Sequence, residues 1–550
     1  MDNTLNSRLT FSGRGIGHGS AIGKLNFYRR SERIGKGGIR RSLSAGEETQ
    51  RLRRAISDAR KQLSELYDST RRRAGEEEAQ IFEIHRMLLE DDDFVSVAES
   101  LILDGYSAAY AVCEAAERYS AVFASIEDEY LSARAADLRD VAARVASIIN
   151  GGSSANTVEL GGNEKYIIAA SDLTPSETVQ LDRDRILGFV TFAGSPNSHT
   201  AILARALGIP ALIGTGEISG DCNGADAIID ADSGLLYVNP DAALLSRYRD
   251  KQRRDAEDAH RQQLMRGRPT VTRSGRRLRL YANIGNVRDA ALAVQNDAEG
   301  IGLLRSEFLY LESDTCPDEE TIFTAYRDIV RTMGGRPVII RTLDIGADKR
   351  VPYIDAGSEE NPALGLRGVR LSLSQHELFR AQLRAVCRAS AYGSVSVMVP
   401  MIAMPHEVER CREIIRSVQA ELGSEGVPYD TEMPLGIMLE TPSAAVMSRE
   451  LAGMVDFFSV GTNDLIQYTL AADRQNPALS ELCENGLEPV LRLIASATEN
   501  AHAAGIWLGI CGELAANTDL TQHFIDIGVD ELSVSPPYVL PLRERISDCN

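Results

Sequence analysis

The sequence has little of what marks disulfide-linked, membrane-spanning or nucleic-acid-binding proteins. Its 8 cysteines are scattered and none forms a Cys-x-x-Cys pair, so the pattern predicts reduced thiols and neither a disulfide framework nor a zinc site. Residues 1–11 are polar and no apolar run is long enough to cross a bilayer, so we expect a cytoplasmic protein with no membrane partner. Lys and Arg number 59 against 79 Asp and Glu, and this acidic balance argues against nucleic acid as a partner.

The size and composition indicate a soluble protein of several domains. The chain has 550 residues, of which 43% are hydrophobic and 25% charged, and these proportions are typical of globular proteins. One hydrophobic core cannot serve a chain of this length, so about three or four domains are expected.

One histidine stands at a predicted helix start. Turn formers at residues 194–197 end the apolar run 186–192, and residues 200–207 favour a helix, which places His199 at the beginning of that helix. A helix N-terminus attracts anions and disfavours an imidazolium, so a neutral His199 could attack phosphorus and be stabilised once phosphorylated. The alternative is a turn histidine that only satisfies hydrogen bonds, and the local sequence alone favours it.

The first half of the chain alternates between two patterns. Glycines at 13, 15, 17, 19 and 23 lead into a strand candidate at 24–28. Their spacing matches neither a Walker loop nor a dinucleotide fingerprint, so tight turns before an edge strand are expected. Helical periodicity then predicts a helical bundle over 44–150, inserted after this strand. Short strands at 165–170, 186–192, 211–214, 227–230 and 235–238 alternate with helical stretches. The sequence therefore predicts a discontinuous α/β domain over 8–43 and 151–240 with the bundle inserted in it.

The second half predicts a connector and a barrel. Residues 241–268 are charged and helix-prone, as suits a semi-rigid connector helix. Over 269–550, eight strand candidates alternate with helical segments, as a (β/α)8 barrel requires. They span 278–284, 300–304, 337–343, 395–399, 435–439, 457–460, 506–510 and 531–534.

Polar residues cluster at or just beyond the C-terminal ends of these strands, where barrel enzymes place their sites. They are Asn283, Arg305, Glu307, Arg341, Asp344, Glu440, Asn463, Asp464, Cys511 and Glu513. Buried charges without partners are costly, so packing alone does not explain six such strand ends. Three arginines, Arg305, Arg341 and Arg474, suit a small molecule that carries phosphate and carboxylate, although each taken alone is more often a structural ion pair.

Four of these residues indicate which chemistry the site could perform. Glu440 and Asp464 supply carboxylates for a hard cation, with Mg2+ the natural candidate and Mn2+ left open, or else they pair with the arginines. Asn463 orients a phosphate oxygen or is only a turn former. Cys511 ends an apolar strand, and with a reference pKa of about 8.5 it is either a proton donor to a carbanion-like carbon or a buried inert thiol.

Over nearly its whole length the sequence resembles the Enzyme I family of the phosphoenolpyruvate-dependent sugar phosphotransferase system, the phosphoenolpyruvate-protein phosphotransferases. The matching stretches occur in one order, which makes the resemblance highly specific. They are 172–176 (DLTPS), 198–202 (SHTAI), 300–309 (GIGLLRSEFL), 341–346 (RTLDIG), 361–365 (NPALG), 436–443 (GIMLETPS), 457–464 (FFSVGTND), 467–470 (QYTL) with 473–474 (DR), and 511–513 (CGE).

The resemblance implies a chemistry and a set of roles. It implies that His199 is the phosphorylated histidine, that Cys511 is the proton donor, and that Glu440 and Asp464 bind Mg2+. It implies that phosphoenolpyruvate is bound by Arg305, Arg341, Asn463, Asp464 and Arg474. It further implies that pyruvate is released, that the phosphoryl group passes to a histidine of the phosphocarrier protein HPr in the first step of sugar uptake, that the helical insert binds HPr, that the barrel forms a homodimer, and that the domain carrying His199 swivels between barrel and HPr.

Two departures from the family pattern stand out. The family usually has Gly-Gly-Arg-Thr before Ser-His, whereas this chain has Gly194-Ser195-Pro196-Asn197 and so lacks a positive charge there. Only a short helical stretch, 542–546, is predicted after the last strand, where the family commonly continues, and this leaves barrel closure and dimer strength open.

Two other functions compete with this interpretation. A pyruvate phosphate dikinase or phosphoenolpyruvate synthase has a similar histidine domain and barrel, but it needs a large nucleotide-binding domain, and no glycine-rich nucleotide loop or spare length is present. The other is a non-catalytic relative that binds phosphoenolpyruvate or HPr as a signal. The complete set of barrel residues argues against it, while the altered 194–197 loop favours it.

Overall fold

A computed structural model describes most of the chain in two compact units, Met1–Ala256 and Glu257–Asn550. The described residues are 8–28, 40–73, 76–124, 129–151, 165–171, 173, 185–193, 200, 201, 204, 209–311, 313, 315–346, 351, 353, 354, 359–474 and 476–550. His199 and the loop 194–197 lie outside them. Within these ranges no helix combines the length and the apolar character that crossing a bilayer requires.

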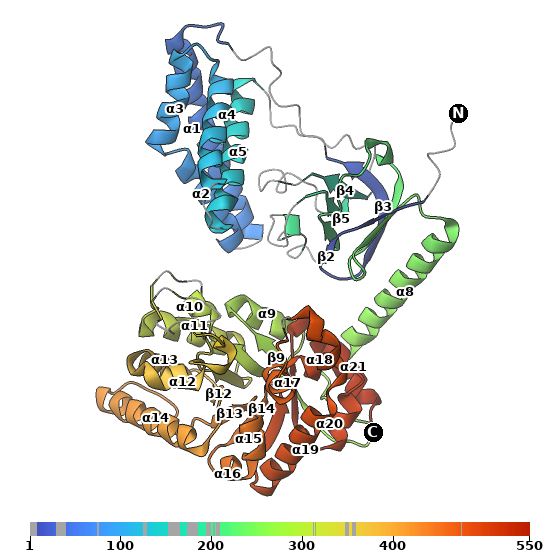
Figure 1. Ribbon diagram of the computed structural model, residues 1–550, viewed down its shortest axis with the longest axis vertical. Coiled ribbons are helices and arrows are strands. Elements are labelled where there is room, and N and C mark those ends of the chain that lie inside the picture. Colours follow the sequence, from blue (N-terminus) through green and yellow to red (C-terminus); the bar gives the residue numbers. More distant parts are fainter. Residues whose placement is uncertain are drawn as a thin grey trace. The chain divides into compact units, whose positions relative to one another are not determined.

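The predicted helical insert is a group of antiparallel helices (Figure 1). They are α1 (Ala45–Arg73), α2 (Glu76–Leu88), α3 (Asp92–Leu103), α4 (Ala108–Ala124) and α5 (Glu129–Ile149). The sequence interpretation names no helix at α3. The sequence does contain the features that favour a helix at α3. Asp91 caps the backbone N–H groups of Asp93 and Phe94, and the apolar residues that follow are buried at helical spacing.

The α/β part of the first unit is one mixed sheet of eight strands in the order β1-β8-β7-β3-β4-β5-β6-β2. The strands are β1 (Leu9–Ser12), β2 (Arg14–Ile16), β3 (Ser20–Phe27), β4 (Tyr166–Ala170), β5 (Ile186–Thr191), β6 (Ala211–Ile213), β7 (Asp226–Asp230) and β8 (Leu235–Val238). Strands β3 to β6 run parallel and the others pair antiparallel.

The sequence interpretation predicts one strand before the helical insert, and this is wrong, because β1, β2 and β3 all precede it. Strands β1 and β2 have only four and three residues, too few for a visible alternation. They exist because β8 and β6 offer free edges to pair with. Predicted strands β4 to β8 are confirmed to within about two residues. Between β5 and β6, Thr200, Ala201 and Ala204 are helical and buried, as the prediction of a helix after position 199 requires.

The connector is confirmed as a single helix, α8 (Ala242–Leu264). Its first half packs on the first unit, where the Tyr248 hydroxyl donates to Asp230 Oδ2 at 2.7 Å and Lys251 lies 2.9 Å from Asp232. Near its end, Arg261 donates to Glu544 at 3.0 Å within the second unit. Each part of the helix is therefore held by side chains of its own unit.

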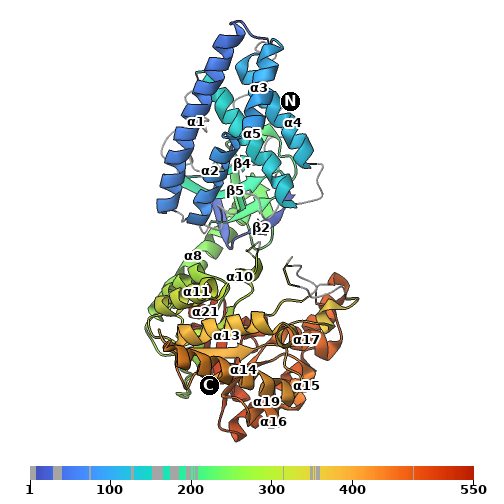
Figure 2. The same cartoon turned by 90° about the vertical axis from the view of Figure 1, so that its left-hand side faces the viewer.

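The second unit is a closed barrel of eight parallel strands with helices around it, which confirms the (β/α)8 prediction (Figures 1 and 2). The strands are β9 (Arg279–Ile284), β10 (Ile301–Arg305), β11 (Val338–Arg341), β12 (Val395–Val399), β13 (Leu435–Leu439), β14 (Phe457–Val460), β15 (Trp507–Ile510) and β16 (Glu531–Val534). The main helices between them are α9 (Val287–Gln295), α11 (Glu319–Thr332), α13 (His376–Ser390), α14 (Pro405–Glu425) and α19 (Glu488–Ala503).

Side chains on the two faces of each barrel strand serve different cores. One face packs against the surrounding helices in a large apolar cluster, while the other fills the barrel with residues such as Leu303, Ile339, Met398 and Met438. Strands of this kind are apolar on both faces and appear in the sequence as continuous hydrophobic runs. That is why eight strands could be predicted.

The barrel closes despite the short C-terminus. Strand β16 pairs with β9 over four residues, from Glu531 opposite Arg279 to Val534 opposite Ala282. The predicted short helix is longer than expected and forms α21 (Val539–Asp548). Its buried Arg543 donates to Thr270 Oγ1 at 3.0 Å and pairs with Asp297, so the last helix fixes the segment that leads into β9.

Candidate active site

The structure brings the predicted polar residues to one mouth of the barrel. Arg341 is the last residue of β11, Glu440 directly follows β13 and Cys511 directly follows β15. Asn463 and Asp464 lie in the first turn of α17 (Thr462–Leu470), which follows β14. Because all eight strands are parallel, these positions share the C-terminal end where barrel enzymes carry their chemistry.

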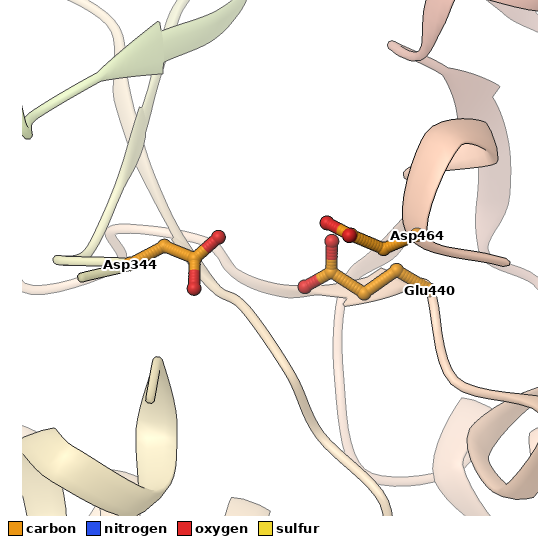
Figure 3. A group of neighbouring side chains, drawn as sticks. All are labelled: Asp344, Glu440 and Asp464. Atoms are coloured by element: carbon orange, nitrogen blue, oxygen red, sulfur yellow. The ribbon is translucent and has the colours of Figure 1, made fainter. Parts of the chain in front are cut away.

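Three carboxylates meet at this mouth. One oxygen each from Asp344, Glu440 and Asp464 lies within 4.8 Å of the others, and Figure 3 shows the three side chains pointing toward one another from different segments. Asp344 and Glu440 are almost fully buried. The sequence interpretation assigns only Glu440 and Asp464 to a cation, so the structure adds Asp344 to this cluster.

The electrostatics of the cluster favour a bound cation. Burial raises the pKa of Glu440 well above its usual range, and the negative charges of Asp344 and Asp464 raise it further. The backbone N–H of Met401 donates to Glu440 Oε1 at 2.6 Å and orients the carboxylate. An all-oxygen donor set of this kind fits a hard divalent cation, which would relieve the mutual repulsion.

Arg341 is buried among acidic partners. Its Nη2 donates to Glu307 Oε1 at 3.0 Å and its Nη1 lies 3.2 Å from Asp344 Oδ2. The backbone N–H of Asp344 also donates to Glu307 at 2.9 Å. The Nε of Arg341 is buried and has no hydrogen-bond partner among the described residues. One N–H of this guanidinium thus remains to bind a ligand.

A further arginine, Arg367, belongs to the site, and the sequence interpretation does not name it. Its Nε and Nη2 donate to the two oxygens of Asp344 at 3.2 and 2.9 Å, and Nη2 lies 3.6 Å from Asp464 Oδ2. Its Nη1 donates to the Tyr468 hydroxyl at 3.2 Å. Arg367 lies in the segment between β11 and α12 (Val369–Ser374), so a search of strand ends passes over it. The sequence gives one indication of Arg367, because this residue lies two positions after the family-matching stretch 361–365.

The three carboxylates differ in how far they pair with arginines and in how far they remain available to a cation. Asp344 pairs with both Arg341 and Arg367, and Asp464 reaches Arg367 at the longer distance of 3.6 Å. Glu440 makes no ion pair within 4.0 Å to a described residue, and its carboxylate accepts a hydrogen bond from the Met401 backbone N–H. The carboxyl oxygens of Glu440 and Asp464 therefore keep capacity for a cation.

Asn463 is tied to the strand that carries the thiol. Its amide nitrogen donates to Glu513 Oε1 at 2.8 Å, and the backbone N–H of Glu513 donates to Asn463 Oδ1 at 3.0 Å. Asn283, another predicted residue of the mouth, donates to the backbone carbonyls of Cys511 and Ser533 at 2.9 and 3.0 Å. Both amides hold the end of β15 in place.

The Cys511 thiol is buried at the mouth, with Sγ 3.6 Å from the carbonyl oxygen of Val460. Burial raises its pKa to about 12. The thiol therefore keeps its proton at neutral pH, which a proton donor requires and a ready nucleophile does not.

The remaining predicted residues are placed less fully. Arg305 is the last residue of β10, is exposed, and has no ion pair with any residue in the described ranges. Arg474 is exposed in the turn after α17, where its backbone N–H donates to Gln467 Oε1 at 3.3 Å. His199 lies outside the described residues, so its role stays a prediction.

Comparison with known proteins identifies the family. Family models described as "PEP-utilising enzyme" match three consecutive parts of the chain: the N-terminal domain at 12–134, the mobile domain at 162–234 and the PEP-binding domain at 259–550. Proteins named phosphoenolpyruvate-protein phosphotransferase are similar over most of their length. That of Staphylococcus carnosus is 39% identical over 90% of this chain and 87% of its own. That of Haemophilus influenzae is 41% identical over 90% and 86%, and that of Bacillus subtilis 38% identical over 97% and 94%.

The chain belongs to the phosphoenolpyruvate-protein phosphotransferase family. The resemblance found in the sequence is thereby confirmed, and so is the interpretation as an enzyme, because these relatives are named as transferases. The model of the PEP-binding domain covers the whole barrel, which contains the carboxylate cluster and Cys511. Membership of this family also favours the phosphotransferase over the dikinase and the non-catalytic alternatives.

Proposed function

We propose that this protein takes the phosphoryl group of phosphoenolpyruvate onto His199, releases pyruvate, and passes the phosphoryl group to a histidine of the phosphocarrier protein HPr. This is the first step of sugar uptake by the phosphotransferase system. The observation that carries the proposal is the meeting of a carboxylate triad, the buried Arg341, the half-buried Arg367 and a protonated thiol at one barrel mouth, in a chain of the phosphoenolpyruvate-protein phosphotransferase family.

Substrate binding uses the cationic groups of the mouth. The buried Nε of Arg341 has no partner among the described residues and offers a donor to an anionic oxygen. Arg305, exposed at the end of β10, and Arg474 add positive charge for a ligand that carries both phosphate and carboxylate. Asn463 and Asp464, at the start of α17, complete the phosphate contacts.

The carboxylates of Glu440 and Asp464, with Asp344 beside them, would hold Mg2+. When bound, the cation supplies charge neutralisation at the phosphoryl oxygens as the P–O bond loosens. Asp344 also orients Arg341 and Arg367 through its ion pairs with both side chains.

Proton transfer completes the first half-reaction. An imidazole nitrogen of His199 attacks phosphorus in line, and the P–O bond to the enolate breaks. The Cys511 thiol then gives its proton to the methylene carbon of the enolate, which forms pyruvate. A pKa of about 12 keeps that proton in place until the enolate forms.

The second half-reaction needs His199 to leave the barrel. One imidazole cannot contact phosphoenolpyruvate and HPr at the same time, so the α/β domain over 8–43 and 151–240 swivels on the connector. The helical insert over 44–150 binds HPr, and the barrel over 269–550 forms the homodimer. The protein works in the cytoplasm, where HPr and phosphoenolpyruvate meet.

The test is to follow the fate of the phosphoryl group with different acceptors. Protein, Mg2+ and labelled phosphoenolpyruvate are mixed with HPr in one arm and with AMP in the other, and pyruvate and labelled acceptor are measured together. Labelled HPr with matching pyruvate supports the proposal. Pyruvate turnover that needs AMP, or no turnover in either arm, overturns it.

A further inference from the structure

A carboxyl group that the proposed chemistry does not use lies inside the barrel. Glu531 is the first residue of β16 and is fully buried. Neither of its carboxyl oxygens has a hydrogen-bond partner among the described residues. Burial raises the pKa of Glu531 well above its usual range, and the nearby Arg279 opposes this only in part. Burial without a hydrogen-bond partner therefore favours the protonated form of this carboxyl group.

The pairing of the strands shows where this carboxyl group points. Ser459 on β14 lies opposite Gly509 on β15, and Gly509 lies opposite Glu531 on β16. A methyl carbon at Gly509 would collide with Glu531 Oε2, and one at Gly302 would stand 2.6 Å from Oε1. The Glu531 side chain thus fills the space inside the barrel that Gly509 and Gly302 leave empty. Ser459, Gly509 and Glu531 lie opposite one another on three adjacent strands, and we call these three residues the row.

The thiol stands one layer above this row. Cys511 directly follows β15, two residues after Gly509, and belongs to the cluster of side chains inside the barrel. The Ser459 hydroxyl interacts with the Cys511 thiol and opposes the rise of its pKa, while the Glu531 carboxyl adds to that rise. Ser459 Oγ is buried and makes no hydrogen bond to a described residue, so its O–H is not committed to another acceptor there.

We propose that Glu531 restores the proton of Cys511 after each turnover, with the Ser459 hydroxyl as the bridge. This inference rests on the proposed function. The thiol proton goes to the enolate carbon and leaves a thiolate. The Ser459 O–H gives its proton to Sγ and takes the carboxyl proton of Glu531. The Glu531 carboxylate recovers a proton from a hydronium ion or a buffer acid, so protons and charges balance.

Solvent is available at the opposite end of the barrel. A cavity of about 660 Å3 opens there, lined by Arg277, Arg279, Tyr281, Glu299, Pro337 and Asp530. Tyr281 lies near Glu531: burial raises the tyrosine pKa, and the ionised form of the Glu531 carboxyl group would raise it further. Arg279 lies over the Trp507 ring, 4.9 Å from its centre. The protons that restore the thiol would thus enter from the end of the barrel away from phosphoenolpyruvate.

The relay makes Glu531 needed for every turnover except the first. A freshly prepared enzyme holds its proton on Cys511, so Glu531→Gln should give one equivalent of pyruvate per subunit at the wild-type rate. Later turnovers should then slow by about tenfold or more, because loss of a positioned proton donor has effects of at least this size. Rapid-quench measurement of pyruvate in the presence of HPr shows such a burst. Ser459→Ala should give the same burst, since it breaks the bridge and leaves the carboxyl group in place.

The slow phase has a signature that a purely structural role lacks. It should speed up with the concentration of buffer acid and slow down as the pH rises, because external acid now restores the thiol. Glu299→Gln, which changes a carboxyl group in the cavity wall but not in the row, is the matched control and should show no burst.

Each result decides between two claims. A wild-type enzyme that forms no phosphoenzyme overturns the proposed function itself. A wild-type enzyme that turns over, with both variants matching its steady rate and showing no buffer dependence, overturns the relay alone. Loss of the first turnover together with the later ones also overturns the relay, because it assigns Glu531 a structural role.

Discussion

Arg367 donates two hydrogen bonds to Asp344, from Nε to Oδ1 at 3.2 Å and from Nη2 to Oδ2 at 2.9 Å. The pair ties the segment after β11 to the carboxylate cluster, and the same guanidinium lies 3.6 Å from Asp464. One planar side chain therefore fixes the geometry between two of the three carboxylates.

Replacing Arg367 by lysine should impair the site, because lysine keeps the positive charge but cannot make both hydrogen bonds of the planar guanidinium. Arg367→Lys leaves Asp344 with at most one of the two bonds. Loss of one charge-assisted hydrogen bond in this partly buried pair costs about 1.5–3 kcal/mol, so we expect kcat/KM for phosphoenolpyruvate to fall roughly tenfold to a hundredfold. Arg370→Lys is the matched control, because Arg370 donates to the backbone carbonyls of Leu364 and Gly365 away from the cluster. Equal effects of the two substitutions would contradict the special position of Arg367.

Glu440 should control cation affinity. Glu440→Gln removes one of the charges that raise the mutual repulsion of the cluster, and we expect Mn2+, used as a probe, to bind about tenfold more weakly or worse. Paramagnetic resonance of free Mn2+ measures this without turnover. Glu409→Gln, at an exposed position of α14, should leave the affinity unchanged. A Glu440 variant that binds Mn2+ like the wild type would remove this residue from the cation site.

The thiol of Cys511 should resist alkylation well above neutral pH. Burial raises its pKa to about 12, so between about pH 7 and pH 9 the sulfur stays protonated, whereas an ordinary thiol loses its proton near about pH 8.5. We expect iodoacetamide to modify Cys511 only slowly in this range, with a rate that rises as the pH approaches 12. Mass spectrometry of the 511 peptide measures the rate, and the denatured chain provides the reference. Fast modification in the folded protein near neutral pH would contradict a protonated donor.

Packing inside the barrel gives a prediction about stability. Gly509→Ala forces a methyl group against Glu531, and we expect a loss of about 1–3 kcal/mol in the free energy of unfolding. Adding Glu531→Ala should relieve most of this loss, and a double-mutant cycle in denaturant measures the coupling. Gly423→Ala is the control, because a carbon there meets nothing closer than 3.5 Å. Simple additivity of the two substitutions would show that the glutamate does not fill the glycine space.

The barrel and its mouth could be predicted because buried parallel strands leave a strong signal. Strands β12, β13, β14 and β16 have the bounds that the apolar runs predict, and polar residues directly after them mark the site. β1 and β2 were missed because four and three residues carry no period, and their pairing partners lie more than 190 residues away.

The part of the site that could not be predicted depends on contacts across the barrel. Arg367 comes from a segment between elements, and only the fold brings it to Asp344. Glu531 begins a strand, at the end away from the mouth, where a search for strand C-termini does not look. Its place inside the barrel follows from Gly509 on the neighbouring strand β15 and from Gly302 on β10, which is separated from β16 by β9, and no local pattern indicates this.

The central claim is that the phosphoryl group of phosphoenolpyruvate goes to His199. Labelled phosphoenolpyruvate and Mg2+ are mixed with the protein without HPr, and label on the protein is measured together with pyruvate. We predict that wild-type protein gains acid-labile, base-stable label in equal amount to the pyruvate formed, and that His199→Ala gains none. Label that persists in His199→Ala would contradict the account.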